Sequence, residues 1–248
     1  MLRPDLLRPP VADAATVSDW RKRFEALSQT ARDARLQAFY AAGMVDGETP
    51  LSAVPLMALD VETTGLDPVK DGIVSIGLVP MSLERIRASA SRHWVLKPRV
   101  PLGEESVTIH GITDSQVMAA PDLKQVLAEV LQAMAGHVLV VHCADIERQF
   151  LNGALRPRIG EDIAFPVIDT MALEARLYRN QPRGWLDWAL GRHPAPVSIR
   201  LADSRLRYNL PRYRPHHALT DALASAELLQ AQVAHRFSPD TPVRELWS

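Results

Sequence analysis

The chain opens with a segment in which apolar residues recur at helical spacing. Intervals of four, three and four residues separate Trp20, Phe24, Leu27 and Ala31, and this spacing predicts an amphipathic helix. We expect Ser18 to cap the helix, with Asp19 in its first turn, and the segment to end near Gly43. The stretch 47–50 is typical of a linker. Packing of this helix against its own domain is expected, and docking of a protein partner is the alternative.

From residue 55 onward, strand patterns and helix patterns interleave. Apolar and β-branched runs predict strands at 55–61, 72–81, 93–96, 138–141 and 166–168. Helical spacing predicts helices over 123–134, 144–155 and 217–234. The run at 138–141 is wholly apolar, which is typical of a strand buried on both faces. Three strands followed by alternating strands and helices indicate an α/β fold, a mixed sheet covered by helices.

Length and composition fit a soluble globular protein. The chain has 248 residues, 47% apolar and 23% charged, which suits one large domain or one domain with an appendage. The longest apolar runs are far shorter than the roughly 20 residues of a membrane span, and no signal peptide is expected. The single cysteine, Cys143, excludes an internal disulfide and fits a reducing compartment. We therefore expect a cytoplasmic protein that makes no membrane contact.

Positive charge is concentrated in one part of the chain, although the net charge is only −1. Between Arg176 and Arg214 the sequence holds nine arginines against two acids. Clustering of one sign suits a surface that binds a phosphate backbone. A solvated basic face in an arginine-rich protein explains the cluster equally well, and both interpretations stay open.

Two acids stand where the first predicted strand ends. Alternation along a strand places Asp60 and Glu62 on the same face. Neighbouring carboxylates repel each other unless a cation lies between them, and their oxygen atoms suit Mg²⁺ or Mn²⁺. The pattern Asp-x-Glu is common and has little weight alone, but its place at the end of a buried strand makes it a candidate metal site.

Two further segments carry groups suited to catalysis. His216 and Asp221 are five residues apart where a loop enters the last predicted helix, and a carboxylate is favoured in a first helical turn. A histidine that titrates near neutrality can act as a general base toward water. The second segment, 142–151, follows the buried strand 138–141 directly.

The three segments together resemble the DEDDh exonucleases, a ribonuclease H-like family that includes the proofreading subunit of bacterial DNA polymerase III. Segments 59–66 and 216–221 are similar to the first and third family motifs, and segments 107–113 and 168–170 also agree. The resemblance spans about residues 54–233. It implies a ribonuclease H-like mixed five-stranded sheet. The chain then divides into an N-terminal helical extension and linker (1–50), an exonuclease domain (51–237) and a C-terminal tail (238–248).

The second motif departs from the family pattern. Cys143 and Glu147 stand where the family usually has Asn and Asp. Glu147 is the acid that matches, because Phe150 and Leu151 follow it at the family spacing. Asp145 lies about 200° around the helix from Glu147 and cannot share its face. We expect a working but altered site, and loss of metal binding by Glu147 is the alternative.

The resemblance implies two-metal hydrolysis of phosphodiester bonds with Mg²⁺ or Mn²⁺. Asp60 would bridge both cations, and Glu62 and Asp221 would hold the cation that carries the nucleophilic water. Glu147 would support the other cation. His216 would take the proton from the water.

The resemblance also implies contacts with the terminal nucleotide by Thr63, Gly65, Leu66 and His110. We expect His217 to be a helix-entry residue and His142 to be structural. The resulting interpretation is a 3′–5′ exonuclease acting on single-stranded nucleic acid, with DNA favoured over RNA. The alternative is a catalytically weakened module of the same fold that binds nucleic acid or a partner.

Overall fold

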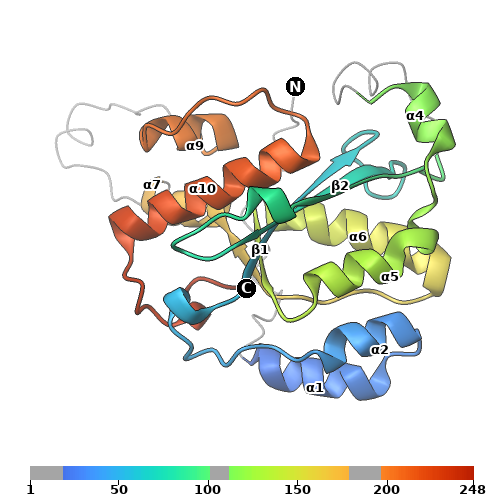
Figure 1. Ribbon diagram of the computed structural model, residues 1–248, viewed down its shortest axis with the longest axis horizontal. Coiled ribbons are helices and arrows are strands. Elements are labelled where there is room, and N and C mark those ends of the chain that lie inside the picture. The colour runs from blue at the N-terminus through green and yellow to red at the C-terminus, as the bar shows by residue number, and fades with distance from the viewer. Residues whose placement is uncertain (1–18, 101–111, 179–196) are drawn as a thin grey trace, which may run out of the picture.

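A five-stranded mixed sheet forms the centre of the molecule (Figure 1), in a computed structural model that describes residues 19–100, 112–178 and 197–248. The strands lie in the order β3-β2-β1-β4-β5. They are β1 (Leu56–Thr63), β2 (Ile73–Met81), β3 (Arg92–Val95), β4 (Val138–Val141) and β5 (Val167–Asp169). The first three strands pair antiparallel, and β4 and β5 run parallel to β1. The predicted mixed sheet and α/β class are confirmed.

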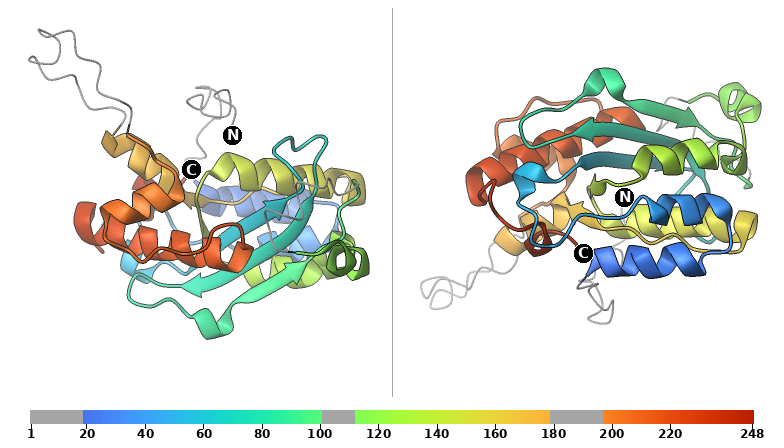
Figure 2. Two further views of the ribbon diagram at one scale, coloured as in Figure 1. Left: turned by 90° about the horizontal axis from the view of Figure 1, so that it is seen from above. Right: turned by 60° about the horizontal axis from the view of Figure 1, so that its bottom comes forward.

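Helices cover both faces of this sheet (Figure 1, Figure 2). On one face α10 (Ala218–Arg236) packs across β1, β2 and β4, beside α7 (Thr170–Tyr178) and α9 (Leu201–Arg207). On the other face lie α5 (Leu123–Met134) and α6 (Ala144–Ile159), preceded by α4 (Asp114–Ala119). The sequence predicted α5, α6 and α10. It missed α4, α7 and α9, whose 6, 9 and 7 residues are too few for a helical period to stand out.

The N-terminal segment forms two helices, α1 (Trp20–Thr30) and α2 (Ala34–Ala41), where the sequence suggested one segment running to Gly43. The predicted cap was also wrong, because Asp19 caps α1 by accepting a hydrogen bond from Lys22 N (3.0 Å). Ser18 lies outside the described residues. The chain breaks after α1 because Ala31 is extended and Asp33 caps α2.

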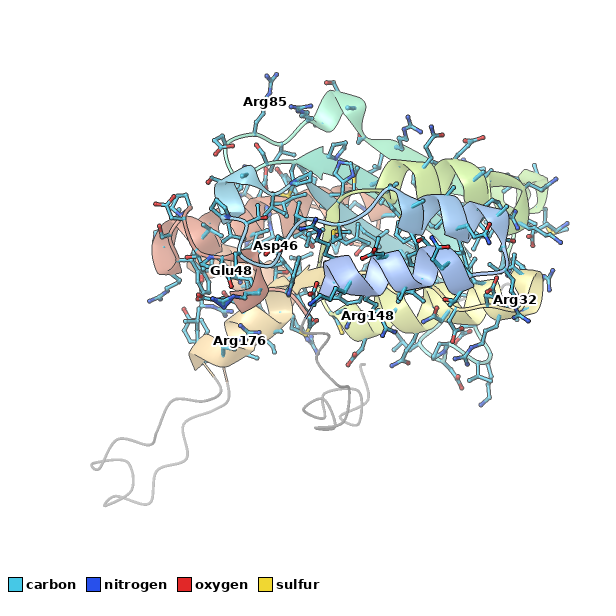
Figure 3. All side chains as sticks on the ribbon, turned by 90° about the horizontal axis from the view of Figure 1, so that it is seen from below. Arg32, Asp46, Glu48, Arg85, Arg148 and Arg176 are labelled. Atoms are coloured by element: carbon cyan, nitrogen blue, oxygen red, sulfur yellow. The ribbon has the colours of Figure 1, made fainter. Side chains whose placement is uncertain are left out.

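The α1–α2 pair packs onto the body of the domain, as predicted. Phe24 is fully buried, and its ring centroid lies 5.4 Å from that of Phe39 and 5.2 Å from that of Tyr40. Tyr40 Oη accepts a hydrogen bond from Ala164 N (2.9 Å). Arg32, beside the end of α6 in Figure 3, donates to Gly160 O (2.8 Å). The apolar face of α1 is thus used inside the molecule.

The last residues close the free edge of the sheet beside β5. Ser248 and Val167 exchange backbone hydrogen bonds of 2.9 and 3.2 Å. Arg148, on α6 (Figure 3), donates to Ser248 O (2.6 Å), and Trp247 is buried. These contacts join residues 243–248 to the same apolar core as the sheet. In the described part of the chain, no helix combines the length and apolarity required to cross a bilayer.

Candidate active site

Three carboxylates meet where β1 ends and α10 begins. One oxygen from each of Asp60, Glu62 and Asp221 lies within 4.8 Å of the others. The two acids of β1 share one face of the strand, as predicted from alternation. A register shift between Glu62 and Thr63 ends the regular pairing of β1 with β2 directly after them. The structure therefore brings together two motifs that are about 160 residues apart in the chain.

A glycine on β2 lets α10 come this close. Gly77 is the register partner of Asp60, and a Cβ at Gly77 would lie 2.5 Å from the carbonyl carbon of Ala218. The first turn of α10 therefore lies directly on the backbone of β2, which places Asp221 against the end of β1. Sequence reasoning missed Gly77, although a glycine inside a strand pattern signals close approach of another backbone.

Two of the three carboxylates, those of Asp60 and Asp221, resist ionisation without a cation. Burial raises the pKa of Asp60 well above its usual value, and the charges of Glu62, Glu147 and Asp221 raise it further. Burial also raises the pKa of Asp221, although the hydrogen bond from His216 N opposes this. A divalent cation would relieve both the burial cost and the repulsion. The donor set, all carboxylate oxygen, fits Mg²⁺ or Mn²⁺.

Glu147 points inward from the first turn of α6. Glu147 is 2% exposed, whereas Asp145 is exposed, so the two acids lie on different faces of α6, as helix geometry predicted. Glu147 Oε2 is buried, with no hydrogen-bond partner among the described residues. Burial raises its pKa well above the usual value. Glu147 stands outside the group of three, but its charge acts on Asp60 and it adds a buried carboxylate beside that group.

His216 lies at the entrance to α10, next to Asp221. Its backbone N–H donates to Asp221 Oδ2 (2.7 Å), and its φ of +67° is left-handed. His216 is exposed, so solvent water can reach its imidazole. His217 is the last residue before α10, which agrees with its predicted place at the helix entry.

Sequence reasoning missed a further histidine beside the site. His93 on β3 pairs with Gly77, so His93, Gly77 and Asp60 form one row across three strands. The ring centroids of His93 and His217 are 5.0 Å apart. Burial lowers the pKa of His93, the charge of His217 lowers it further, and the charge of Glu62 opposes both. The sequence held no signal for His93, because its proximity follows from strand order alone.

Hydrogen bonds of Asp169 and His142 hold the start of the second motif, residues 142–151, in place. Asp169 accepts hydrogen bonds from Cys143 N and Ala144 N (both 3.0 Å) and from Met171 N (2.8 Å), so it caps both α6 and α7. The His142 ring lies 2.8 Å from Thr170 Oγ1 and 3.0 Å from Ile199 O. Burial lowers the pKa of His142 to about 4, which keeps it neutral at pH 7. The structural role expected for His142 agrees with these contacts.

The end of β1 and the loop that follows it carry three of the residues expected to contact the terminal nucleotide. Thr63 Oγ1 donates to Gly65 O (2.6 Å) and is buried. Gly65 is half-buried, and Leu66 is 47% exposed, so its side chain is open to solvent. The fourth residue, His110, lies outside the described residues.

Two arginines of the basic stretch turn out to be structural. Arg205 is 4% exposed and paired with Glu227 (2.7 Å), and Arg207 is bound to the buried carboxylate of Glu174. Arg200, Arg212 and Arg214 are exposed, and Arg179, Arg183 and Arg192 lie outside the described residues. A phosphate-binding surface can therefore draw on fewer charges than the sequence count suggested.

A family model described as an exonuclease, RNase_T, matches residues 57–229. The chain belongs to this exonuclease family. The match covers most of the chain and all four carboxylates, and the predicted membership among DEDDh, epsilon-like exonucleases is confirmed.

Named relatives of this exonuclease include polymerase subunits. It is 29% identical to the DNA polymerase III subunit epsilon of Treponema pallidum, over 73% of this chain and 78% of that one. It is 32% identical to a DNA polymerase III subunit epsilon-like protein of Rhodobacter capsulatus, over 73% of this chain and 24% of that one. The exonuclease thus spans only about a quarter of that longer relative.

The fold is also that of a solved DEDDh nuclease. The nuclease domain of 3′hExo, bound to rAMP, superposes with a TM-score of 0.60 at 18% identity, over 73% of this chain and 92% of that one. This likeness confirms the ribonuclease H-like fold of the exonuclease.

Proposed function

We propose that this exonuclease hydrolyses phosphodiester bonds from the 3′ end of single-stranded nucleic acid, with DNA favoured over RNA. The observation that carries the proposal is the convergence of Asp60, Glu62 and Asp221 beside the exposed imidazole of His216. Catalysis is assigned to residues 51–237. The proposal includes both the direction of cleavage and the single-stranded substrate, in line with the DEDDh motifs.

Asp60, Glu62 and Asp221 would hold one divalent cation, and Asp60 with Glu147 a second. When bound, such cations neutralise charge on the scissile phosphate and activate the attacking water. The Nδ1 or Nε2 atom of His216 would accept the proton of that water and pass it to solvent. The hydrogen bond from His216 N to Asp221 keeps the base beside the carboxylate cluster. Thr63, Gly65, Leu66 and His110 would orient the terminal nucleotide.

Names of the relatives support DNA as the substrate. Both polymerase III relatives belong by name to DNA synthesis, whereas the superposed 3′hExo domain holds rAMP. RNA is therefore tested beside DNA as a substrate. The word subunit in those names also supports a protein partner. We assign that contact to the exposed face of α1, where Arg21, Lys22 and Glu25 point outward, since its apolar face is buried inside the molecule.

The test uses 5′-labelled single-stranded DNA and RNA of one sequence, with Mg²⁺, with Mn²⁺ and with EDTA. A ladder that shortens from the 3′ end is expected with either cation, faster on DNA, and absent in EDTA. Asp60→Ala should abolish it and leave the fold intact, because removing one of four crowded carboxylates relieves repulsion. Asp240→Ala, an exposed acid in another loop, is the matched control and should cleave normally.

His216→Ala should slow cleavage and leave Mn²⁺ binding near normal, and an unchanged rate would remove His216 from the mechanism. Intact, bound oligonucleotide with both cations would contradict the proposal. It would favour a weakened binding module, with Glu147 as the cause. Glu147→Asp tests that cause directly, since restored cleavage would show that the longer side chain had disabled the site.

A further inference from the structure

The loop that joins β1 to β2 is folded around one carboxylate, that of Asp71. Thr64 Oγ1 donates to Asp71 Oδ1 (3.0 Å), and Asp67 N donates to Asp71 Oδ2 (2.9 Å). Gly72 N in turn donates to Thr64 Oγ1 (3.1 Å), and Thr64 N donates to Gly72 O (2.9 Å). Both ends of the loop are thus tied to each other through Asp71 and its hydrogen-bonded partner.

Gly65 lies directly against this carboxylate. A Cβ at Gly65 would lie 2.5 Å from Asp71 Oδ2, far inside van der Waals contact. The absence of a side chain at residue 65 therefore allows the loop to close on Asp71. This contact also fixes the backbone of Gly65, and Gly65 precedes the exposed Leu66. Both residues lie just after β1, the strand that carries Asp60 and Glu62.

Behind the loop, the described residues leave a cavity. A cavity of about 220 Å³ lies between loop residues 68–72 and the helix α6, and Val69 is 89% exposed. Pro68 and Gly153, which both line this cavity, lie close together, since a Cβ at Gly153 would be 2.8 Å from Pro68 O. Backbone hydrogen bonds from Lys70 N (3.0 Å) and Asp71 N (2.7 Å) to Asp67 O close the turn at residues 67–71, and the Asp71 carboxylate adds the side-chain link that joins this turn to Thr64.

We propose that Asp71 is a positioning residue for substrate. It holds residues 64–67 in the conformation in which Gly65 and Leu66 receive the 3′-terminal nucleotide. This inference rests on the proposed function, since it assigns a substrate to the loop. Asp71 lies outside the group of carboxylates that could hold a cation, so its effect falls on substrate binding and leaves the cation site unchanged.

The substitutions separate hydrogen bonding from charge. Asp71→Ala removes both acceptors, and Asp71→Asn keeps one acceptor for Asp67 N and can donate its amide to Thr64 Oγ1. Thr64→Val breaks the same link from the other side at nearly equal volume. Glu84→Gln is the control, because Glu84 is an acid of the β2–β3 loop at the opposite end of these strands, bonded only to Ser82 among the described hydrogen bonds.

The measurement is steady-state cleavage of a 5′-labelled dT oligonucleotide in Mn²⁺ by the full chain. Asp71→Ala should raise KM about tenfold, the effect of losing one or two hydrogen bonds, with kcat within about twofold. Asp71→Asn should restore most of the affinity. Thr64→Val should raise KM, and the two effects should be less than additive in the double variant, because both changes break the hydrogen bond between Thr64 and Asp71. Glu84→Gln should match the unchanged protein.

Two further measurements distinguish a failure of this inference from a failure of the proposed function. In Ca²⁺, binding of the fluorescent oligonucleotide should weaken about tenfold in Asp71→Ala, whether or not the protein cleaves. Affinity for Mn²⁺ alone should stay the same. Unchanged KM and binding in both Asp71→Ala and Thr64→Val would overturn the inference, even if the unchanged protein cleaves well. A fall in kcat together with weaker Mn²⁺ binding would also overturn it, since Asp71 would then act through the cation site.

Discussion

Cys143 adopts φ +96° and ψ +73° at the residue where β4 turns into α6. A left-handed conformation costs a residue with a Cβ roughly 1–2 kcal/mol, and asparagine enters it more readily. The carboxylate of Asp169 imposes this turn, because it holds the N–H groups of Cys143 and Ala144. The residue that departs from the family pattern is therefore also one of the strained residues of the chain.

Cys143→Asn should raise the free energy of unfolding by about 1 kcal/mol, because it relieves the left-handed strain and leaves both bonds to Asp169. Urea unfolding of the metal-free protein measures this change. Cys143→Ala is the control and should give no such gain, since alanine keeps the Cβ penalty. Equal stability of the Asn and Ala variants would contradict the explanation.

The buried neutral His142 predicts a dependence of stability on pH. Its pKa is lowered by burial to about 4, against 6.5 in an unfolded chain. Between these values the unfolded chain binds a proton that the folded protein does not, so stability falls as the pH drops from 6.5 toward 4. The full loss is about 3 kcal/mol. The stability advantage over His142→Gln should shrink by that amount between pH 7 and pH 4, and a constant difference would show that His142 does not titrate.

At the scale of elements, short α9 is fixed to its neighbours by buried polar contacts. Arg205 donates to Ala224 O (2.7 Å) on α10 and pairs with Glu227, while Arg207 and Tyr208 both bind Glu174 on α7. Burial is possible for these charges because each has an opposite charge or carbonyl oxygen in reach. Within a short stretch, some arginines are therefore paired with acids inside the molecule, whereas Arg212 and Arg214 are exposed to solvent.

Substitution of a buried arginine and substitution of an exposed arginine should change different properties of the protein. Arg205→Ala should cost about 2–4 kcal/mol of unfolding free energy, because it removes the positive charge paired with Glu227 and the buried hydrogen bond to Ala224 O. Arg212→Ala should change stability by less than about 0.5 kcal/mol. If Arg212 contacts a phosphate of single-stranded DNA, its loss should reduce the salt dependence of binding by about one unit of slope. Thermal unfolding and salt-titrated DNA binding distinguish the two, and identical profiles would contradict the assignment.

At the scale of the whole molecule, one apolar core joins segments from both ends of the chain. It contains Trp20 and Phe24 of α1, the sheet, and Leu246 and Trp247 near the end. The helical segment before the sheet therefore contributes to the stability of the domain.

Phe24→Ala should lower the free energy of unfolding by about 3–5 kcal/mol, because a fully buried ring is removed from contact with Phe39 and Tyr40. The loss should appear in a single transition followed by both circular dichroism and fluorescence. Glu25→Ala, on the exposed side of the same helix, is the control. A separate early transition would show that α1 and α2 unfold independently of the sheet.

Much of this architecture could be predicted because its signals are local. Alternation along 56–63 placed Asp60 and Glu62 on one face, and helical geometry separated Glu147 from Asp145. The break after Ala31 and the short helices α4, α7 and α9 could not be predicted, because capping by Asp33 and packing against neighbours decide them. For a similar reason, the nine arginines of the basic stretch overstated the positive charge available to bind phosphate. The sequence does not reveal which of these arginines have a buried acidic partner.

The sequence by itself determined which side chains are available for chemistry, namely the acids and His216, and the order of the strands and helices that carry them. Periodicity and motif spacing are properties of neighbouring residues, so they can be read along the chain. Only the tertiary structure decided which distant groups meet. Gly77 beneath α10, His93 beside His217, and Asp71 inside its loop are each placed by strand order, register and close backbone contact, which no local pattern encodes.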